Sequence, residues 1–425
     1  MREKIDQFAE KYLYKSDFIR NVIVLMSGTA IAQAVPFLIS PLLTRIYSPT
    51  DFGYFGLYTS IVSILVVIAA LRFDLAIMLP KKHIDAFKIY FLATLITTIY
   101  TFIISVFVVG YYFLSPGDNW QNWLLLIPIS VFILGNYQNL NYWNNRLKKF
   151  KVISKAKVIR SFSSAIIQLC LGYYFQSYIW LIIGVLAGQL IEVIILFYYN
   201  KSFLRLSKIL NIKKLKATFR ENIGFIKVDS FSALLNSSSI YLPILLLPKL
   251  YSEEEAGLYF QAFKILSLPA ALVGAAFSQV FFQKVSSLKG SPIEMAETVK
   301  NTIKKLFYLS ILPAIIIIVF GPDLFSFVFG SQWYVSGKYA QAIVPWVLSN
   351  FIFAPISFVY TVQKRFKEFL LFNITLLLIR SLVFVLGPSY ELSSIAILTY
   401  YSLFSSVMYL FMIRRAYVIS KTSHL

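Results

Sequence analysis

Long apolar runs separated by short polar segments dominate the chain between residues 21 and 413. Runs such as 311–320 and 370–378 show no alternation of apolar and polar residues, so the pattern is not that of a membrane β-barrel. A helix needs about 20 mostly apolar residues to cross a hydrocarbon layer of roughly 30 Å. Twelve runs of this kind lie near 21–43, 54–79, 89–114, 123–143, 161–176, 179–199, 223–247, 258–282, 306–329, 340–362, 369–387 and 393–413. We therefore predict an all-α integral membrane protein with twelve transmembrane helices.

The composition agrees with this prediction and disfavours other classes of protein. Of the 425 residues, 58% are hydrophobic and only 14% are charged, whereas about a quarter of a soluble domain is charged. A soluble enzyme, a disordered scaffold and a secreted disulfide-rich module are therefore disfavoured. One cysteine, Cys170, and two histidines, His83 and His424, provide no intramolecular disulfide and no His/Cys metal cluster, so we expect no metal and no cofactor.

Basic residues are distributed unevenly over the two sides of the membrane. Of the 40 Lys and Arg residues, 33 fall on the side of the N-terminus, four lie within predicted spans, and three (Arg45, Lys249 and Lys338) lie on the opposite side. Because cytoplasmic loops carry the excess of Lys and Arg, we place both termini in the cytoplasm. The net charge of +21 then reflects topology and contact with membrane lipids, and we expect no nucleic-acid partner.

The first 20 residues predict an amphipathic helix on the membrane surface. Ile5, Phe8, Tyr12 and Leu13 fall on one helical face, while the rest of the segment is strongly charged. A solvated tail is the alternative. No short apolar core with a small-residue cleavage site follows, so we expect no cleavable signal peptide.

The two halves of the chain share a sequence pattern. The segment LTRIYSPTDFGYF after the first span matches LPKLYSEEEAGLY after the seventh, 204 residues later, and the match includes Gly53 and Gly257. A polar stripe also recurs on one face of the preceding helices. Its members are Thr29, Gln33, Pro36 and Ser40 in the first half and Ser232, Asn236, Ser239 and Pro243 in the second. We infer a duplication.

Each half has six spans, which is an even number, so both halves insert into the membrane with the same orientation. The pattern therefore predicts two six-helix bundles related by a pseudo-twofold axis along the membrane normal, with substrate bound between them. The predicted segments are a cytoplasmic N-terminal segment (1–20), an N-lobe (21–199), a basic cytoplasmic linker (200–222), a C-lobe (223–413) and a cytoplasmic tail (414–425).

Seven ionisable residues of the predicted spans are candidates for a functional role, because charge within a membrane is costly and usually faces a bundle interior or a wet cavity. They are Arg72, Asp74, Glu192, Lys227, Asp229, Lys264 and Arg380. Arg380 shares a helical face with Asn373, and Glu192 is in line with Gly184 and Gly188, which let a neighbouring helix approach closely.

Each of these charges also has a purely structural interpretation. In that interpretation Arg72 and Asp74 form a simple ion pair at the cytoplasmic water line, and Lys227 and Lys264 reach the lipid head groups. Arg380 and Glu192 form buried structural pairs. No GxxxxGK, HExxH or GxSxG motif is present, so the sequence predicts neither an enzyme nor transport driven by ATP hydrolysis within this chain.

The segments FIRNVIVLMSGTAIAQ, LLTRIYSPTDFGYFGLYTSI and LRFDLAIMLPKK resemble polysaccharide flippases of the Wzx type, which belong to the multidrug/oligosaccharidyl-lipid/polysaccharide exporter superfamily. The resemblance is densest over about the first 80 residues. It implies a two-lobed bundle of twelve helices that moves undecaprenyl-diphosphate-linked oligosaccharide repeat units from the cytoplasmic to the periplasmic leaflet of the bacterial inner membrane. A polysaccharide polymerase and a chain-length regulator are the implied protein partners.

On this interpretation the site residues fall into three groups. Arg72, Lys264 and Arg380 hold the diphosphate; Gln33, Gln168, Asn236 and Asn373 contact sugars; Asp74, Glu192 and Asp229 couple transport to an ion gradient or to the membrane potential. Members of the family characteristically have a cationic lumen. The seven charges sum to only +1, which leaves the sign of the lumen open.

Three other functions compete with this one. A drug/cation exporter of the same superfamily would need acidic cavity residues, and Arg380 argues against it. A lipid II flippase often has two further helices. A membrane-embedded polymerase or ligase usually carries a large periplasmic loop, whereas the outer segments here are short.

Overall fold

The computed structural model describes residues 17–114, 121–200, 212–269, 273–288 and 291–422. Within these ranges every regular element is a helix, as predicted. The chain divides into two compact units: unit 1 comprises Met1–Ile39 and Ile61–Leu234, and unit 2 comprises Ser40–Ser60 and Leu235–Leu425. The predicted amphipathic helix and the first part of the predicted linker lie outside the described residues.

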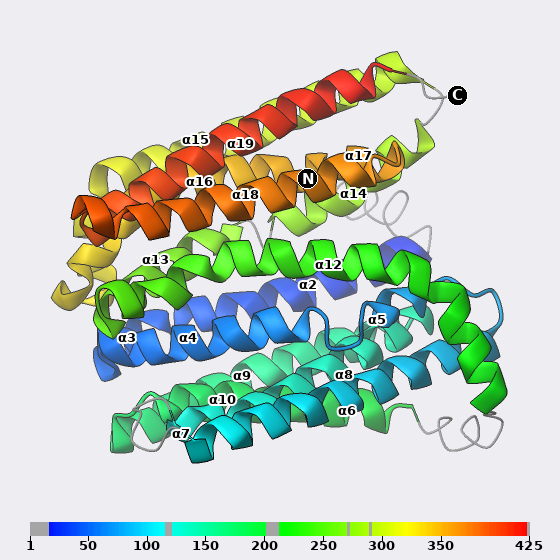
Figure 1. Ribbon diagram of the computed structural model, residues 1–425, viewed down its shortest axis with the longest axis horizontal. Coiled ribbons are helices and arrows are strands. Elements are labelled where there is room, and N and C mark those ends of the chain that lie inside the picture. Colours follow the sequence, from blue (N-terminus) through cyan, green and yellow to red (C-terminus); the bar gives the residue numbers. More distant parts are fainter. Residues whose placement is uncertain (1–16, 115–120, 201–211, 270–272, 289–290, 423–425) are drawn as a thin grey trace, which may run out of the picture. The chain divides into compact units, whose positions relative to one another are not determined.

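Unit 1 is built from the helices of the first half of the chain (Figure 1). They are α2 (Asp17–Leu38), the end of α4 (Pro49–Val66), α5 (Phe73–Ala76), α6 (His83–Leu114), α7 (Gln121–Leu124), α8 (Leu126–Arg146), α9 (Phe150–Phe175), α10 (Ile179–Tyr198) and the first part of α12 (Ile212–Leu250). Because α12 begins at Ile212, the last part of the predicted linker is helical and continues directly into the seventh span.

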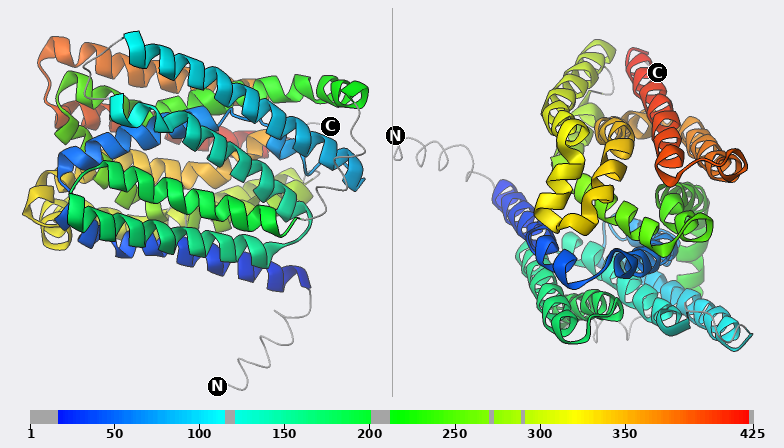
Figure 2. Two further views of the ribbon diagram at one scale, coloured as in Figure 1. Left: turned by 90° about the horizontal axis from the view of Figure 1, so that it is seen from below. Right: turned by 90° about the vertical axis from the view of Figure 1, so that its left-hand side faces the viewer.

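Unit 2 contains the remaining helices. They are α3 (Ser40–Ile46), α13 (Glu253–Pro269), α14 (Ala275–Ser287), α15 (Pro292–Phe329), η3 (Ser331–Trp333), α16 (Tyr334–Ile356), α17 (Phe358–Val362), α18 (Phe366–Leu386), η4 (Pro388–Tyr390) and α19 (Ser394–Ser420), together with the first part of α4 and the second part of α12. The long helices α15 and α16 pack side by side (Figure 2).

Nine helical segments of the described residues are long and apolar enough to span a membrane. Three of the twelve predicted spans, 54–79, 123–143 and 258–282, are not among them, although all three contain helices. The prediction of one continuous helix over 54–79 is wrong, because α4 ends at Val66 and an irregular segment separates it from α5. The span 123–143 falls short because its second half is more polar and rich in asparagine.

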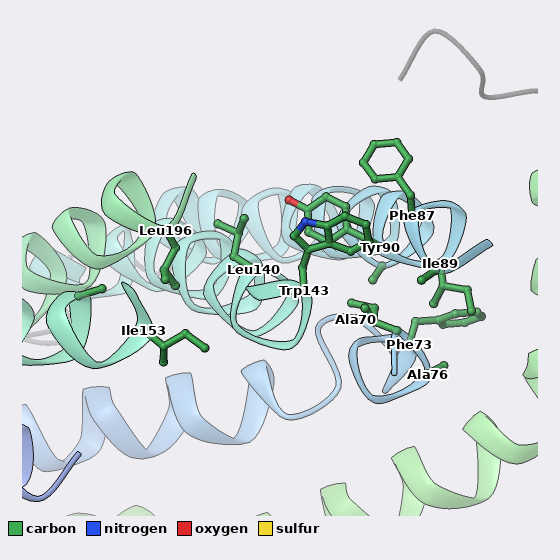
Figure 3. Close-up of a cluster of buried hydrophobic side chains, with 14 residues drawn as sticks. Ala70, Phe73, Ala76, Phe87, Ile89, Tyr90, Leu140, Trp143, Ile153 and Leu196 are labelled. Atoms are coloured by element: carbon green, nitrogen blue, oxygen red, sulfur yellow. The ribbon is translucent and has the colours of Figure 1, made fainter. Parts of the chain in front are cut away.

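A hydrophobic cluster fixes α5 after this irregular segment. Phe73 and Ala76 of α5 are buried in a core to which α6 contributes Tyr90 and α8 contributes Trp143 (Figure 3). The rings of Tyr90 and Trp143 lie 5.6 Å apart. The guanidinium of Arg146 donates to four backbone carbonyls between residues 77 and 81, which satisfies the polar groups that the broken helix leaves free. Packing and hydrogen bonds therefore hold the segment that carries Arg72 and Asp74 in place.

The two matching loop segments contact each other through equivalent residues within unit 2. A Cβ atom on Gly53 would lie 2.0 Å from the backbone oxygen of Glu253, and a Cβ atom on Gly257 would lie 1.7 Å from that of Pro49. Pro49 and Glu253 are separated by the same 204 residues as the two glycines. The crossing of α4 and α13 is thus locally twofold symmetric, which supports the inferred duplication.

Further hydrogen bonds attach the start of the first repeat to unit 2. The carbonyl oxygen of Thr44 accepts from Gln332 Nε2 at 2.7 Å and from Trp333 Nε1 at 3.0 Å. Ser40 Oγ accepts from Gln261 Nε2 at 3.0 Å, and both side chains are fully buried. These contacts explain why residues 40–60 cluster with the second half of the chain, although the sequence predicts them as part of the N-lobe.

The predicted topology is tested by cysteine labelling of intact cells in a Cys170→Ser background. We expect Ser389→Cys, at an exposed position of η4, and Asn119→Cys to react with a membrane-impermeant maleimide from outside. Lys148→Cys, exposed on the predicted cytoplasmic side, is the matched control and should react only after lysis. The opposite labelling pattern would contradict the topology.

Candidate functional site

Arg380 of α18 is a completely buried cation, with 0% of its surface exposed. Its Nε donates to Ser405 Oγ of α19 at 2.8 Å, and its Nη1 donates to Ser239 Oγ of α12 at 2.9 Å. The guanidinium carbon lies 4.9 Å from the ring centroid of Trp346 and 4.6 Å from that of Tyr401. Hydroxyl groups and aromatic faces stabilise this charge, and among the residues that the structure describes no carboxylate pairs with it.

The cluster around Arg380 contains buried groups that can donate a hydrogen bond and have no acceptor in the described structure. Arg380 Nη2, Trp346 Nε1 and the hydroxyl of Tyr259 are all buried without a partner in the described part of the chain. Tyr259 and Arg380 also interact electrostatically. A buried donor without an acceptor costs about 1–3 kcal/mol, more when it is charged. An anionic ligand at this cluster would supply the missing acceptors.

An aromatic stack extends this cluster along α13. The ring of Phe263 is parallel to that of Trp346 at 5.6 Å and stacks on Tyr259 at 6.1 Å. The next residue, Lys264, is half-buried, with its Nζ 5.6 Å from the ring centroid of Phe52. No ion pair of Lys264 occurs within the described residues. The predicted diphosphate ligands Arg380 and Lys264 therefore lie on helices of one unit, and both are uncompensated by acidic partners there.

Arg72 stands in a different setting, at the irregular segment of unit 1. Leu71 and Arg72 both have left-handed backbone conformations, with φ of 46° and 61°, which is uncommon for residues other than glycine. Arg72 Nε donates to Asp229 Oδ2 of α12 at 2.8 Å. Asp74 is buried and interacts electrostatically with both residues. The pairing considered from sequence was with Asp74; the direct partner of Arg72 is Asp229.

Glu192 of α10 is 1% exposed and forms an ion pair with Arg160 of α9, with 3.0 Å between Oε2 and Nη1. Lys157 also contributes electrostatically to its surroundings. The two helices approach closely because Cβ atoms on Gly184 and Gly188 would overlap with atoms of α9. The structure thus shows the close helix approach that these glycines predict, and Glu192 is directed inward.

Comparison of the two repeats shows why Arg380 is unusual. The fifth predicted spans correspond to α9 and α18, and the sixth to α10 and α19. In unit 1 the cation of the fifth helix, Arg160, is neutralised by Glu192 of the sixth. In unit 2 the cation of the fifth helix, Arg380, meets only neutral groups among the described residues of the sixth: the hydroxyl of Ser405 and the rings of Tyr401 and Tyr409. Both fifth helices thus carry a cation, at different positions along the helix, and within the described residues only the cation of unit 1 has an acidic partner.

The amide side chains predicted to contact sugars differ in their burial and hydrogen bonding. Gln168 is buried and donates to a backbone carbonyl of α10 at 2.9 Å, which is a structural role between two helices. Asn373 is buried two turns before Arg380 on α18. Gln33 and Asn236, equivalent positions in the polar stripes, are both partly buried. The side chain of Lys227 lies outside what the structure describes.

The structure therefore assembles the candidate residues into separate groups. Arg72, Asp74 and Asp229 form one group in unit 1, and Glu192 forms another with cations that the sequence assigned to a cytoplasmic loop. Arg160 was missed as a partner, although it lies four residues before Ser164 and continues the polar face of α9. The aromatic partners of Arg380 were also missed, because tryptophan and tyrosine in apolar helices carry no positional signal.

The role of Glu192 is tested by the Glu192→Gln variant. Because Arg160 then loses its buried counter-ion, we expect a loss of stability of about 3 kcal/mol, measured by thermal unfolding. The double variant Glu192→Gln/Arg160→Gln should recover most of that loss. If Glu192 instead only couples ions, Glu192→Gln would keep its stability, and the double variant would gain nothing. The gradient dependence of transport is measured in parallel.

Comparison with known proteins identifies the class of protein that has this fold. The inward-facing structure of a multidrug resistance MATE family transporter of the MOP superfamily is similar, with 13% identity, a TM-score of 0.70, and coverage of 94% of this chain and 96% of that chain. The lipid II flippase MurJ in an inward closed conformation has 15% identity and a TM-score of 0.60, and the match covers 91% of this chain and 89% of that chain. A MOP superfamily transporter from Pyrococcus furiosus, described as having a binding pocket of reversed polarity, has 12% identity and a TM-score of 0.66, covering 96% and 98%. The protein thus has the multi-pass helical membrane fold of these transporters.

A family model narrows this class. The model described as "Polysaccharide biosynthesis protein" matches residues 42–338, more than half of the chain, so the chain belongs to that family. A search of curated proteins finds no match. The predicted resemblance to polysaccharide-biosynthesis proteins is confirmed, and the fold is that of the superfamily named in the sequence analysis.

Proposed function

We propose that the protein is a flippase that translocates undecaprenyl-diphosphate-linked oligosaccharide repeat units from the cytoplasmic to the periplasmic leaflet of the bacterial inner membrane. It would do so by alternating access of two six-helix lobes, 21–199 and 223–413, with both termini in the cytoplasm. The observation that carries the proposal is Arg380, a fully buried guanidinium without a carboxylate partner among the described residues.

The chemistry of the substrate explains why such a cation is needed. A diphosphate does not cross hydrocarbon unaided, because its hydration is lost there. A guanidinium presents a planar fork of donors that matches phosphate oxygens, and Arg380 keeps Nη2 free of protein partners in the described structure. Lys264 supplies a second positive charge on α13. Gln33, Asn236 and Asn373 offer amide groups to sugar hydroxyls.

The acidic residues are proposed to couple transport to a gradient or to the membrane potential. Asp229 pairs with Arg72 in this structure, next to Asp74, and Glu192 pairs with Arg160. A carboxylate that takes up a proton or binds a cation would weaken its ion pair with arginine. This would shift the equilibrium between the inward-open and outward-open conformations of alternating access. Arg72 becomes available to the diphosphate only when its bond to Asp229 opens.

A drug/cation exporter is the competing function, and the solved MATE structures share the fold. A cationic drug needs an uncompensated carboxylate in the cavity. Among the described residues of the predicted spans, Asp74, Glu192 and Asp229 lie in unit 1 beside arginines. Unit 2 holds the uncompensated cations, and its one carboxylate in these spans, Asp323, is exposed near the end of α15. This distribution favours an anionic substrate.

Deletion of the gene tests the proposal in the cell. We expect loss of surface polysaccharide and accumulation of the lipid-linked repeat unit, which remains inaccessible to reagents added outside. The polymerase and chain-length regulator, proposed as partners, then lack substrate. Normal polymer together with increased sensitivity to cationic drugs would instead support the exporter.

A further inference from the structure

Unit 2 contains an apolar groove that the site described above does not use. It is a cavity of about 230 Å³ between α13, α15 and α16. Its floor is buried and its rim is exposed: Ala314, Val344 and Phe351 are 8%, 4% and 6% exposed, whereas Leu309 on the rim is 48% exposed. Apart from the hydroxyl of Ser310, the lining side chains are aliphatic or aromatic.

The groove opens beside a surface that faces lipid. Leu312, Ile315 and Val319 of α15 are 64%, 49% and 57% exposed, as expected for side chains against acyl chains. The cavity is smaller than the roughly 300–1,000 Å³ of pockets that enclose a whole drug-sized ligand. It is therefore suited to a segment of a hydrocarbon chain that enters from the bilayer.

Two of the helices that form the groove, α13 and α16, also contribute to the cluster around Arg380 and Lys264. On α13, Lys264 precedes the lining residue Leu266 by two positions; on α16, Trp346 stacks against Arg380 while the adjacent Val347 lines the groove. The groove is thus adjacent in sequence to residues that carry or contact positive charge: Lys264 on α13, and Trp346 on α16 against Arg380 of α18. This combination complements a ligand in which an anionic group is attached to a hydrocarbon chain.

We propose that the groove holds the part of the isoprenoid chain nearest to the diphosphate of the lipid-linked glycan. The inference rests on the flippase function proposed above. A phospholipid keeps its phosphate at the membrane surface, whereas only a translocating lipid brings its phosphate to a cation buried within α18. Holding the first part of the chain in the groove positions the diphosphate beside Arg380 and Lys264 and keeps the rest of the chain in the bilayer.

Photolabelling of the full-length protein in proteoliposomes tests this inference. The probe is undecaprenyl diphosphate with a diazirine on an isoprene unit near the phosphate, and labelled peptides are mapped by mass spectrometry. We expect labels within 309–317 and 344–351. Ala314→Phe, which fills the groove, should reduce labelling about tenfold, the change expected when roughly two methylene groups lose their burial. Ile316→Phe, on the exposed face of α15 outside the groove, is the matched control and should label normally.

The possible outcomes separate the inference from the function on which it rests. Undiminished labelling of Ala314→Phe, or equal labelling by a straight-chain phosphatidic acid diazirine, overturns the proposed occupant. If Ala314→Phe does not fold, Val347→Phe fills the same groove from α16 and carries the same expectation. A wild-type protein that translocates lipid-linked glycan without labelling in the groove contradicts only this inference; a wild-type protein that does not translocate it contradicts the flippase function.

Discussion

Arg380→Ala is expected to reduce the translocation of lipid-linked glycan by about 100-fold and to abolish surface polysaccharide. The reason is that the variant removes the buried cation that offsets the lost hydration of the diphosphate. Losing one partner of a buried charged contact costs about 2–5 kcal/mol, and about 2.7 kcal/mol corresponds to that factor. Translocation is measured in vesicles, and polymer is measured on the cell surface.

Controls separate this effect from misfolding. Arg380→Lys keeps the charge but loses the planar fork that bonds Ser239 and Ser405, so we expect it to retain only part of the activity. Arg414→Ala removes an exposed arginine at the end of α19 and should transport normally. Protein amount and thermal unfolding are compared for all three variants. Wild-type transport by a well-folded Arg380→Ala protein would remove Arg380 from the site.

Gly257→Ala is expected to have the largest effect on stability, with a loss of about 3 kcal/mol or more in the free energy of unfolding. The added Cβ atom would lie 1.7 Å from the backbone oxygen of Pro49, so α4 and α13 must separate. Overpacking against flexible side chains typically costs about 1–3 kcal/mol, and here the obstacle is backbone. Because this packing of α4 on α13 would be disrupted, we expect transport to be lost as well.

The chain provides matched variants for this test. Gly53→Ala, at the equivalent position of the first repeat, meets the backbone oxygen of Glu253 at 2.0 Å and should behave like Gly257→Ala. Gly110→Ala on α6 has no atom within 4 Å of the added Cβ and should be neutral or slightly stabilising. Thermal unfolding of the purified proteins compares the three. Equal stability of Gly257→Ala and Gly110→Ala would contradict the helix crossing seen here.

The all-helical membrane fold was predictable from the sequence because the length of an apolar run is set by the thickness of the bilayer. The repeat was also visible, since Gly53 and Gly257 recur with the same neighbours. The break after Val66 was not, because LRFDLAIM is apolar enough to continue a helix and its left-handed residues are held by tertiary contacts. Similarly, the assignment of residues 40–60 to unit 2 depends on hydrogen bonds to distant residues.

The candidate site was predictable only in part. Charge in an apolar span identifies costly residues, which is why Arg380, Glu192 and Asp229 were found. Sequence spacing does not show which charges neutralise each other. The pair of Arg72 with Asp229 joins residues 157 positions apart, and the pair of Glu192 with Arg160 required the packing of α9 on α10. The absence of such a partner for Arg380 in the described structure is likewise a tertiary property.

The most direct measurement is translocation of undecaprenyl-diphosphate-linked repeat units in vesicles containing only the purified protein. A glycan-modifying enzyme outside the vesicles reports which substrate molecules have reached the outer leaflet. We predict that wild-type protein makes the inner-leaflet pool accessible, that Arg380→Ala does not, and that Arg414→Ala matches wild type. An inner-leaflet pool that remains protected with well-folded wild-type protein, under an imposed gradient and membrane potential, would contradict the flippase function.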